Sequence, residues 1–115
     1  MIEVCFSSGS NGELELKVQG HAGQAEFGKD IVCASASILL YTVAQSVLDM
    51  EQLGYLKTAP TVNTQSGKAI VKCCPKSKHR AKVKQVYTVA QTGYQLLAEN
   101  FPQYVELTTF GKAKA

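Results

Sequence analysis

Residues 2–20, IEVCFSSGSNGELELKVQG, set the architecture of this chain. Apolar and polar residues alternate along residues 2–6 and again along residues 14–18, which is the two-residue period of a half-buried strand. The pair Asn11-Gly12 lies between the two alternating segments, and such a pair favours a tight hairpin turn. This stretch therefore predicts two antiparallel strands that share one buried face.

Two helical patterns follow the hairpin. The first begins near Asp30, a suitable N-cap for which Ser35 is the alternative, and ends near Gly54. The second starts at about Ser77 and is closed by Pro102. Both patterns carry apolar residues at three- and four-residue spacings, as an amphipathic helix does. The inward residues are Ala36, Leu39, Leu40, Val43, Ala44, Val47 and Leu48 in the first, and Val83, Val86, Tyr87, Ala90, Tyr94 and Leu97 in the second.

Three further strands complete the predicted order of elements. Residues 58–64 and 68–73 form a second hairpin around Gln65-Ser66-Gly67, and Val105 and Leu107 mark a short final strand. The order is β-β-α-β-β-α-β. Two helices with one apolar stripe each are buried most simply on the same face of a sheet. We therefore predict an α+β two-layer sandwich, with a largely antiparallel sheet and two helices on one face.

Length and composition limit the class of protein. A chain of 115 residues is expected to form a single domain over residues 1–115, with a frayed tail at residues 111–115. Its 45% hydrophobic and 18% charged residues are ordinary for a soluble globular protein, and its net charge of +3 is mild. We find neither an apolar run approaching the roughly 20 residues of a membrane span nor a secretory signal. We therefore expect a cytoplasmic protein without membrane contact.

The four cysteines are Cys5, Cys33, Cys73 and Cys74. In a reducing cytoplasm all four are expected to be thiols. Cys73 and Cys74 are adjacent, so their side chains point to opposite faces of a strand, and together with His79 they fit no standard zinc spacing. We expect no metal site and no cofactor.

A histidine and a cysteine flank a loop within residues 20–37, GHAGQAEFGKDIVCASAS. His21 follows the second strand, and Cys33 falls in the first turn of the predicted helix. A thiol is a good nucleophile only as thiolate, and an imidazole and the positive end of a helix both favour that form. The pattern therefore predicts a cysteine–histidine hydrolase in which Cys33 is the nucleophile and His21 the general base.

Neighbouring residues are candidates for supporting or substrate-binding roles. Gly20 and Gly23 would let backbone and substrate approach closely. Ser37 falls four residues after Cys33 and shares its face of the helix. Phe27, together with Tyr41, could line an apolar pocket near the thiol.

These residues also have ordinary structural interpretations. The cysteine could be a buried core residue, and the histidine could simply face solvent at the end of a strand. Asp30 could orient the histidine as the carboxylate of a triad does, although a helix cap is favoured for it. A capping or solvent-exposed role is the default for Ser37.

Positive charges concentrate in residues 72–84. A solvated helix start explains them, but they could also form an RNA-binding surface, although no aromatic residues are interleaved with them. An alternative function is thus a non-catalytic ribosome- or RNA-associated module. A thiol-based redox sensor at Cys33 is a third interpretation, without an obvious resolving cysteine nearby. The basic segment contains Lys72, Lys76, Lys78, His79, Arg80, Lys82 and Lys84.

Two motifs carry a resemblance to a known family. Residues 20–23, GHAG, and residues 28–37, GKDIVCASAS, resemble the signature of the ribosomal-processing cysteine protease family, Prp. Chain length and element order are similar too, so the resemblance covers essentially the whole chain. It implies that Cys33 is the nucleophile and His21 the base, with Asp30 and Ser37 at supporting positions.

The resemblance also implies a substrate and an assembly. Proteins of this family remove a short N-terminal extension from a large-subunit ribosomal protein of the L27 type, cut after an aromatic residue, and are usually homodimers. We therefore expect this chain to act on a ribosomal protein precursor, to form a homodimer and to need no cofactor.

Overall fold

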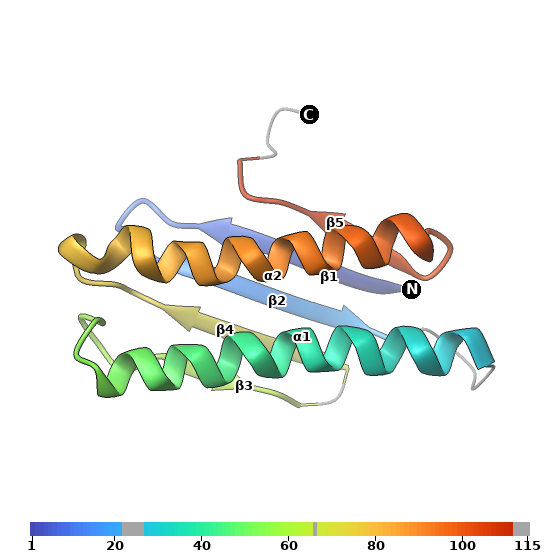
Figure 1. Cartoon of the computed structure of the whole chain (residues 1–115), viewed down its shortest axis with the longest axis horizontal. Coiled ribbons are helices and arrows are strands. Elements are labelled where there is room, and N and C mark those ends of the chain that lie inside the picture. Colours follow the sequence, from blue (N-terminus) through green and yellow to red (C-terminus); the bar gives the residue numbers. More distant parts are fainter. Residues whose placement is uncertain (22–26, 66, 112–115) are drawn as a thin grey trace.

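The computed structural model describes residues 1–21, 27–65 and 67–111, and of residues 27–30 it describes the backbone alone. Within these limits the elements follow the predicted order (Figure 1). Of the expected frayed tail, only Gly111 lies within the described residues, in a turn. The strands are β1 (Ile2–Ser8), β2 (Leu14–Gly20), β3 (Thr61–Asn63), β4 (Lys68–Cys73) and β5 (Val105–Thr108). The helices are α1 (Phe27–Gln52) and α2 (Arg80–Asn100), with the short 3-10 helix η1 (Ser77–His79) before α2.

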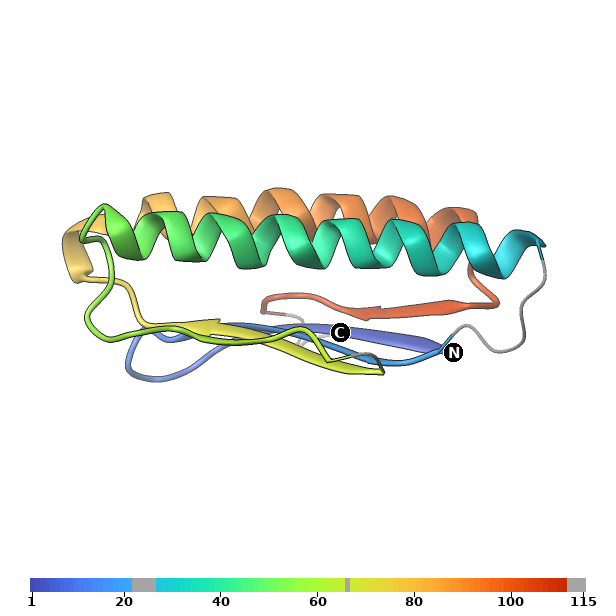
Figure 2. The same ribbon diagram turned by 90° about the horizontal axis from the view of Figure 1, so that it is seen from below.

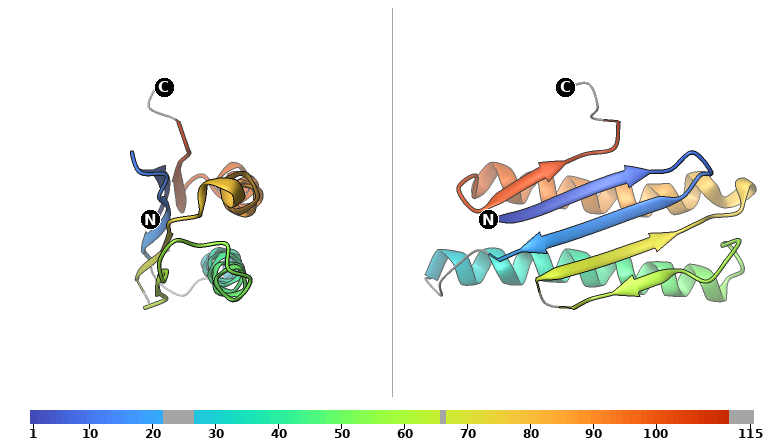
Figure 3. Two further views of the ribbon diagram at one scale, coloured as in Figure 1. Left: turned by 90° about the vertical axis from the view of Figure 1, so that its left-hand side faces the viewer. Right: turned by 180° about the vertical axis from the view of Figure 1, so that it is seen from behind.

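The strands form one sheet in the order β3-β4-β2-β1-β5. The predicted hairpin pairs β1 with β2 antiparallel, with Val4 opposite Val18. Strands β2 and β4, and β3 and β4, are also antiparallel, whereas β5 runs parallel to β1 with Val105 opposite Ile2. The rear view in Figure 3 shows this arrangement. The prediction of a largely antiparallel sheet is confirmed, and its one parallel pair among the described strands lies at the β5 edge.

Both helices cover the same face of the sheet (Figure 2), as predicted. The core between the two layers is apolar, and alternate residues of the two central strands point into it. Because the side-chain period of a strand is two, a one-residue slip would turn this apolar set toward solvent, so the register is strongly fixed. Fully buried side chains of the core include Val4, Phe6, Leu14, Leu16, Val32, Val43, Val47, Val71, Val83, Tyr87 and Tyr94.

Helix α1 buries a narrower stripe than the sequence predicts. Val43 and Val47 are fully buried as expected, whereas Leu39 is only half-buried and Leu48 is 39% exposed. The helix lies on the sheet with α2 at its side, so its outer side remains uncovered. Ile31–Gln52 is also long and apolar enough by length and composition to cross a membrane, contrary to the expectation from apolar runs. Only 33% of its most apolar window is buried in this fold, so much of the apolar character lies on the uncovered outer side of α1.

Helix α1 begins one turn earlier than the sequence predicts. Its first residue is Phe27, so Asp30 lies inside the helix and is not its N-cap. Ser35 does not cap it either, because its hydroxyl donates a hydrogen bond of 2.8 Å to the carbonyl of Ile31 within the helix. Cys33 consequently falls in the second turn.

Two buried tyrosines of α2 connect it to the sheet and to α1. The Tyr87 hydroxyl donates to the carbonyl of Val71 in β4 at 3.1 Å, and the Tyr94 hydroxyl donates to the carbonyl of Ala36 in α1 at 2.8 Å. Burial raises the pKa of both phenols well above the usual range, because the charged phenolate would lose its hydration. The tyrosines therefore act as neutral core residues.

These phenols predict a loss of stability in alkali. In the unfolded chain they lose their protons near the ordinary pKa of about 10, whereas the folded protein keeps them protonated. The free energy of unfolding should therefore be constant below about pH 10 with respect to these groups and fall above it. Urea unfolding at about pH 8 and about pH 11 measures this change, and Tyr87→Phe with Tyr94→Phe should reduce it. An equal fall in the double variant would contradict the assignment.

Candidate active site

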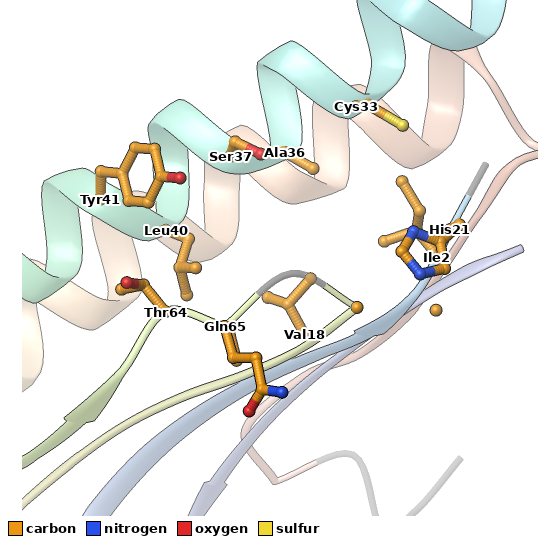
Figure 4. A pocket seen from close by; sticks show the side chains of 13 residues that line it. Ile2, Val18, His21, Cys33, Ala36, Ser37, Leu40, Tyr41, Thr64 and Gln65 are labelled. Atoms are coloured by element: carbon orange, nitrogen blue, oxygen red, sulfur yellow. The ribbon is translucent and has the colours of Figure 1, made fainter. Parts of the chain in front are cut away.

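His21 and Cys33 line the same pocket, although one follows β2 and the other lies in α1 (Figure 4). The pocket has a volume of about 190 Å³. Its walls are the N-terminal half of α1, the end of β2 and the connection from β3 to β4. The fold therefore brings together the histidine and the cysteine that the sequence singles out.

The rotation of α1 aims Cys33 at the pocket. Val32 is fully buried and Ala36 nearly so, which fixes the face of the helix that meets the sheet. Cys33, Ser37 and Tyr41 are spaced by four residues and form a stripe beside that face, and all three line the pocket. Cys33 is half-buried rather than enclosed, so a peptide could reach its sulfur.

The backbone of His21 is held from two sides. The amino nitrogen of Met1 donates a hydrogen bond of 2.7 Å to the carbonyl of His21. The amide of Gly20 donates one of 2.9 Å to the carbonyl of Gly67 in the β3–β4 connection. Gly20 has a φ of +88°, and a Cβ there would collide with the carbonyl oxygen of Met1. Only glycine is therefore suited to position 20, the last residue of β2 before His21.

The imidazole of His21 packs directly on Gly67. A Cβ at this glycine would lie 2.7 Å from Nε2 and 3.1 Å from Cε1 of His21. Gly67 also has a φ of +84°, which disfavours other residues. The sequence shows Gly67 only as part of a hairpin turn, so its contact with the histidine could not be seen there.

The floor of the pocket is apolar and its rim is polar. Such a pocket suits an apolar side chain of a peptide, since a cavity of about 150 Å³ already holds a benzene ring. Sequence analysis proposed only Ser37 and Tyr41 among these residues, because the others come from segments far apart in the chain. The floor consists of Ile2, Val18, Ala36, Leu40 and Ala69, and the rim includes Ser37, Tyr41, Thr64 and Gln65.

The sulfur of Cys33 points from α1 across the mouth of the pocket, toward the side on which His21 lies (Figure 4). Among the hydrogen bonds of the described residues, none joins the two side chains. Catalytic hydrogen bonds are often long without substrate and tighten in its complex. A thiol and an imidazole facing one apolar pocket are the groups that thiol-dependent peptide hydrolysis requires.

The structure corrects the expected role of the helix end. Cys33 lies in the second turn of α1, so its own amide belongs to the hydrogen-bond ladder of the helix. The effect of a helix dipole falls off within the first turn, and the free amides belong to residues before Cys33. The end of the helix therefore contributes little to stabilising a thiolate at Cys33.

Three other predicted site residues lie partly or wholly outside the part of the chain that the structure describes. Gly23 lies outside the described residues. Phe27 and Asp30 are placed in α1 by their backbone, while their side chains are outside the described part. The expected pocket contact of Phe27 and the triad role of Asp30 therefore stay predictions.

The remaining cysteines lie away from the pocket. Cys73 is 3% exposed, and burial raises the pKa of its thiol, so it is a poor nucleophile. Cys5 is half-buried in β1, and Cys74, also half-buried, directly follows β4. Within residues 1–21, 27–65 and 67–111, no three His, Cys, Asp or Glu side chains gather as a metal ion would need.

Comparison with known proteins defines the class. The family model described as cysteine protease Prp matches residues 1–106. A comparison with curated proteins gave no match. The chain belongs to the Prp family, and it is a cysteine protease.

Solved structures agree in fold. The S. aureus ribosomal processing protease Prp, in complex with a covalently linked product peptide, is 21% identical, with a TM-score of 0.69 over 95% of this chain and 99% of that chain. The same S. aureus protease with a substrate peptide is 20% identical, with a TM-score of 0.67 over 95% and 99%. SMU.848 from Streptococcus mutans is 27% identical, with a TM-score of 0.67 over 96% and 94%.

The packing of Gly67 generates a prediction. Gly67→Ala should displace the imidazole of His21 and lower peptide cleavage by about 100-fold, the effect of a misplacement of about 1 Å. Gly54→Ala is the matched control, because Gly54 has a similar φ of +80° but nothing within 4 Å of a Cβ. Both variants carry the same backbone strain, so thermal unfolding should report similar losses of stability. Equal activity of the two variants would show that Gly67 does not position the histidine.

Proposed function

We propose that Cys33 is the nucleophile and His21 the general base of this protease. The observation that carries the proposal is that these two side chains face one open pocket in a chain of the Prp family. The buried thiol of Cys73 offers no comparable site, because its environment favours the protonated form.

The reaction follows from the chemistry of the two groups. His21 takes the proton of the Cys33 thiol, and the thiolate attacks the carbonyl carbon on the amino side of the scissile bond. The carbon–nitrogen bond then breaks, the departing amine receives the proton from His21, and a thioester joins the peptide to Cys33. Water, deprotonated by His21, cleaves the thioester and releases the acid and the free thiol. Each proton removed is returned, so no cofactor takes part.

The proposed substrate is a ribosomal protein precursor. We infer that the protease removes a short N-terminal extension from a large-subunit ribosomal protein of the L27 type, in the cytoplasm where ribosomes assemble. Membership of the Prp family supports this inference. So does the likeness of fold to a ribosomal processing protease that was solved with substrate and product peptides.

Cleavage after an aromatic residue is part of the same proposal. The apolar floor formed by Val18, Leu40 and Ala69 lies below the sulfur of Cys33, and the pocket volume of about 190 Å³ admits one aromatic ring. The hydroxyl groups of Ser37 and Thr64 on the rim could hold the peptide backbone beside it. A ring that enters this pocket would present its own carbonyl carbon to the sulfur.

The proposal predicts an inactive but folded enzyme in Cys33→Ser. This variant should keep its thermal unfolding temperature and still bind the precursor, but turnover should fall by several powers of ten, and His21→Ala should lose a similar amount. Incubation of the full-length precursor with the wild-type enzyme, followed by mass spectrometry of the products, measures activity and locates the cut.

Cys5→Ser is the matched control, because Cys5 is equally half-buried but lies in β1 away from the pocket. It should process the precursor normally. Normal processing by Cys33→Ser would end the assignment of the nucleophile, and a cut after a residue other than an aromatic one would remove the proposed specificity.

We further propose that the protease forms a homodimer through the outer face of its two helices. Ile38 of α1 is 60% exposed and Val89 of α2 is 61% exposed, although both are large and apolar. An apolar groove of about 500 Å³ runs between the helices and is lined by Leu39, Val86 and Val89. Contiguous apolar surface of this kind is typical of protein interfaces, and a twofold axis would place the same face of a second copy upon it.

The dimer proposal predicts that Val89→Glu separates the copies, because the change would bury an unpaired carboxylate in the apolar interface. Analytical ultracentrifugation should show a dimer for the wild type and a monomer for the variant. Gln95→Glu controls for the added charge, because Gln95 is exposed on the same helix but does not line the groove. A monomeric wild-type protein at micromolar concentration would contradict the proposal.

A further inference from the structure

Two aromatic rings stack at the end of the molecule farthest from the pocket. The rings of Tyr55 and His79 lie 4.2 Å apart, centre to centre, with an angle of 20° between their planes. The ammonium nitrogen of Lys82 lies 4.9 Å from the centre of the Tyr55 ring. No aromatic residue is interleaved with the basic residues of segment 72–84 in the sequence, and the fold supplies one from the segment that follows α1.

The backbone fixes this arrangement. Helix α1 is followed by Gly54, whose φ of +80° turns the chain, and the amide of Tyr55 donates to the carbonyl of Met50 at 3.0 Å. The amide of Lys57 then donates to the carbonyl of Cys74, and the amide of Lys76 to the carbonyl of Tyr55, each at 2.8 Å. The aromatic pair therefore lies on two chain segments that hydrogen bonds hold side by side.

The charges that act on the His79 ring are all positive. Lys76, Lys78 and Lys82 are exposed, and none has a carboxylate partner among the described residues. The first turns of η1 and α2 contain no acidic residue, although the positive end of a helix favours one. Partial burial, and then the charges of Lys78, Lys82 and Lys76, lower the pKa of His79, so its ring is uncharged at neutral pH. A bound anion would relieve this repulsion.

We propose that this surface, which we call the Tyr55 surface (Tyr55, Lys76, Lys78, His79 and Lys82), binds single-stranded RNA. The lysines would contact successive phosphates, and an unpaired base would stack against the aromatic pair. The ring pair favours RNA over an acidic protein or an anionic membrane, because the flat face of an unpaired base can stack on an aromatic ring. A base within a double helix is already stacked, which favours a single strand.

The location of the Tyr55 surface leaves the pocket free. The pocket lies at the N-terminal half of α1, and the Tyr55 surface lies at its C-terminal end, along the 44 Å dimension of the molecule (Figure 1). RNA binding here would hold the protease on an RNA-containing particle while a peptide occupies the pocket. The proposal does not depend on the catalytic roles of His21 and Cys33, since none of the five residues lines the pocket.

Fluorescence anisotropy with a labelled oligouridine, titrated with the full chain at several salt concentrations, tests the proposal. Lys78→Glu with Lys82→Glu should weaken binding at least tenfold and reduce the slope of log affinity against log salt by about 0.7 for each phosphate that the variant no longer neutralises. Lys17→Glu with Lys68→Glu changes the net charge equally in strands away from the surface, and should weaken binding much less. Equal weakening in the two double variants would show that RNA affinity depends only on the net charge of the protein, and would overturn the proposal.

The aromatic pair has its own test. Tyr55→Phe should keep the wild-type affinity, whereas Tyr55→Leu should weaken binding about tenfold with an unchanged salt slope, because only stacking is removed. Thermal unfolding of both variants checks that the fold is intact. An unchanged affinity in Tyr55→Leu, or tighter binding to phosphatidylserine vesicles than to oligouridine, would overturn RNA as the partner. Peptide cleavage should be normal in all these variants, which separates this test from that of the protease activity.

Discussion

Burial of one sheet face under two helices governs the whole arrangement. Leu14, Leu16 and Val71 of the central strands are completely buried, and the alternation of their strands permits only one register. The helices must turn their apolar stripes to this face, and Val32 does so at the start of α1. That rotation leaves Cys33 beside the buried stripe, where it is accessible from the pocket. The thiol of Cys33 is thus oriented by the same burial that stabilises the fold.

The pocket forms where segments distant in sequence meet at one end of the sandwich. The backbone of His21 is fixed by hydrogen bonds at Met1 and Gly20, and its ring rests on Gly67 of the neighbouring connection. Cys33 is fixed from the opposite side by α1. The imidazole and the thiol therefore come from different parts of the fold, His21 directly after β2 and Cys33 within α1, and the packing of α1 on the sheet brings both to one pocket.

The two ends of the sandwich offer different chemistry. Near the start of α1, an apolar floor below a thiol and an imidazole suits a peptide side chain. Near its end, lysines and a stacked aromatic pair form a cationic surface, and the first turns of η1 and α2 beside it contain no acidic residue. Between them the exposed apolar groove of α1 and α2 offers a third surface. Peptide and RNA would meet opposite ends of the molecule, whereas Lys82 belongs to the Tyr55 surface and also lines the groove, so these two surfaces adjoin.

Local patterns in the chain were enough to predict the order of elements and to single out His21 and Cys33, which line one pocket. The alternation of residues 2–6 and 14–18, the turn at Asn11-Gly12 and the apolar spacings of the helices all involve near neighbours in sequence. The motifs around His21 and Cys33 likewise lie close together in the chain, and they carried the resemblance to the family. The start of α1 was predicted one turn late, because the free amides of a first turn leave little energetic difference between neighbouring start positions.

The contacts of Gly67 with the imidazole and of Tyr55 with His79 could not be predicted in this way. Each contact joins segments far apart in sequence, so no local spacing or propensity encodes it. These contacts form only in the folded protein, after burial of the sheet face has fixed the position and rotation of each helix.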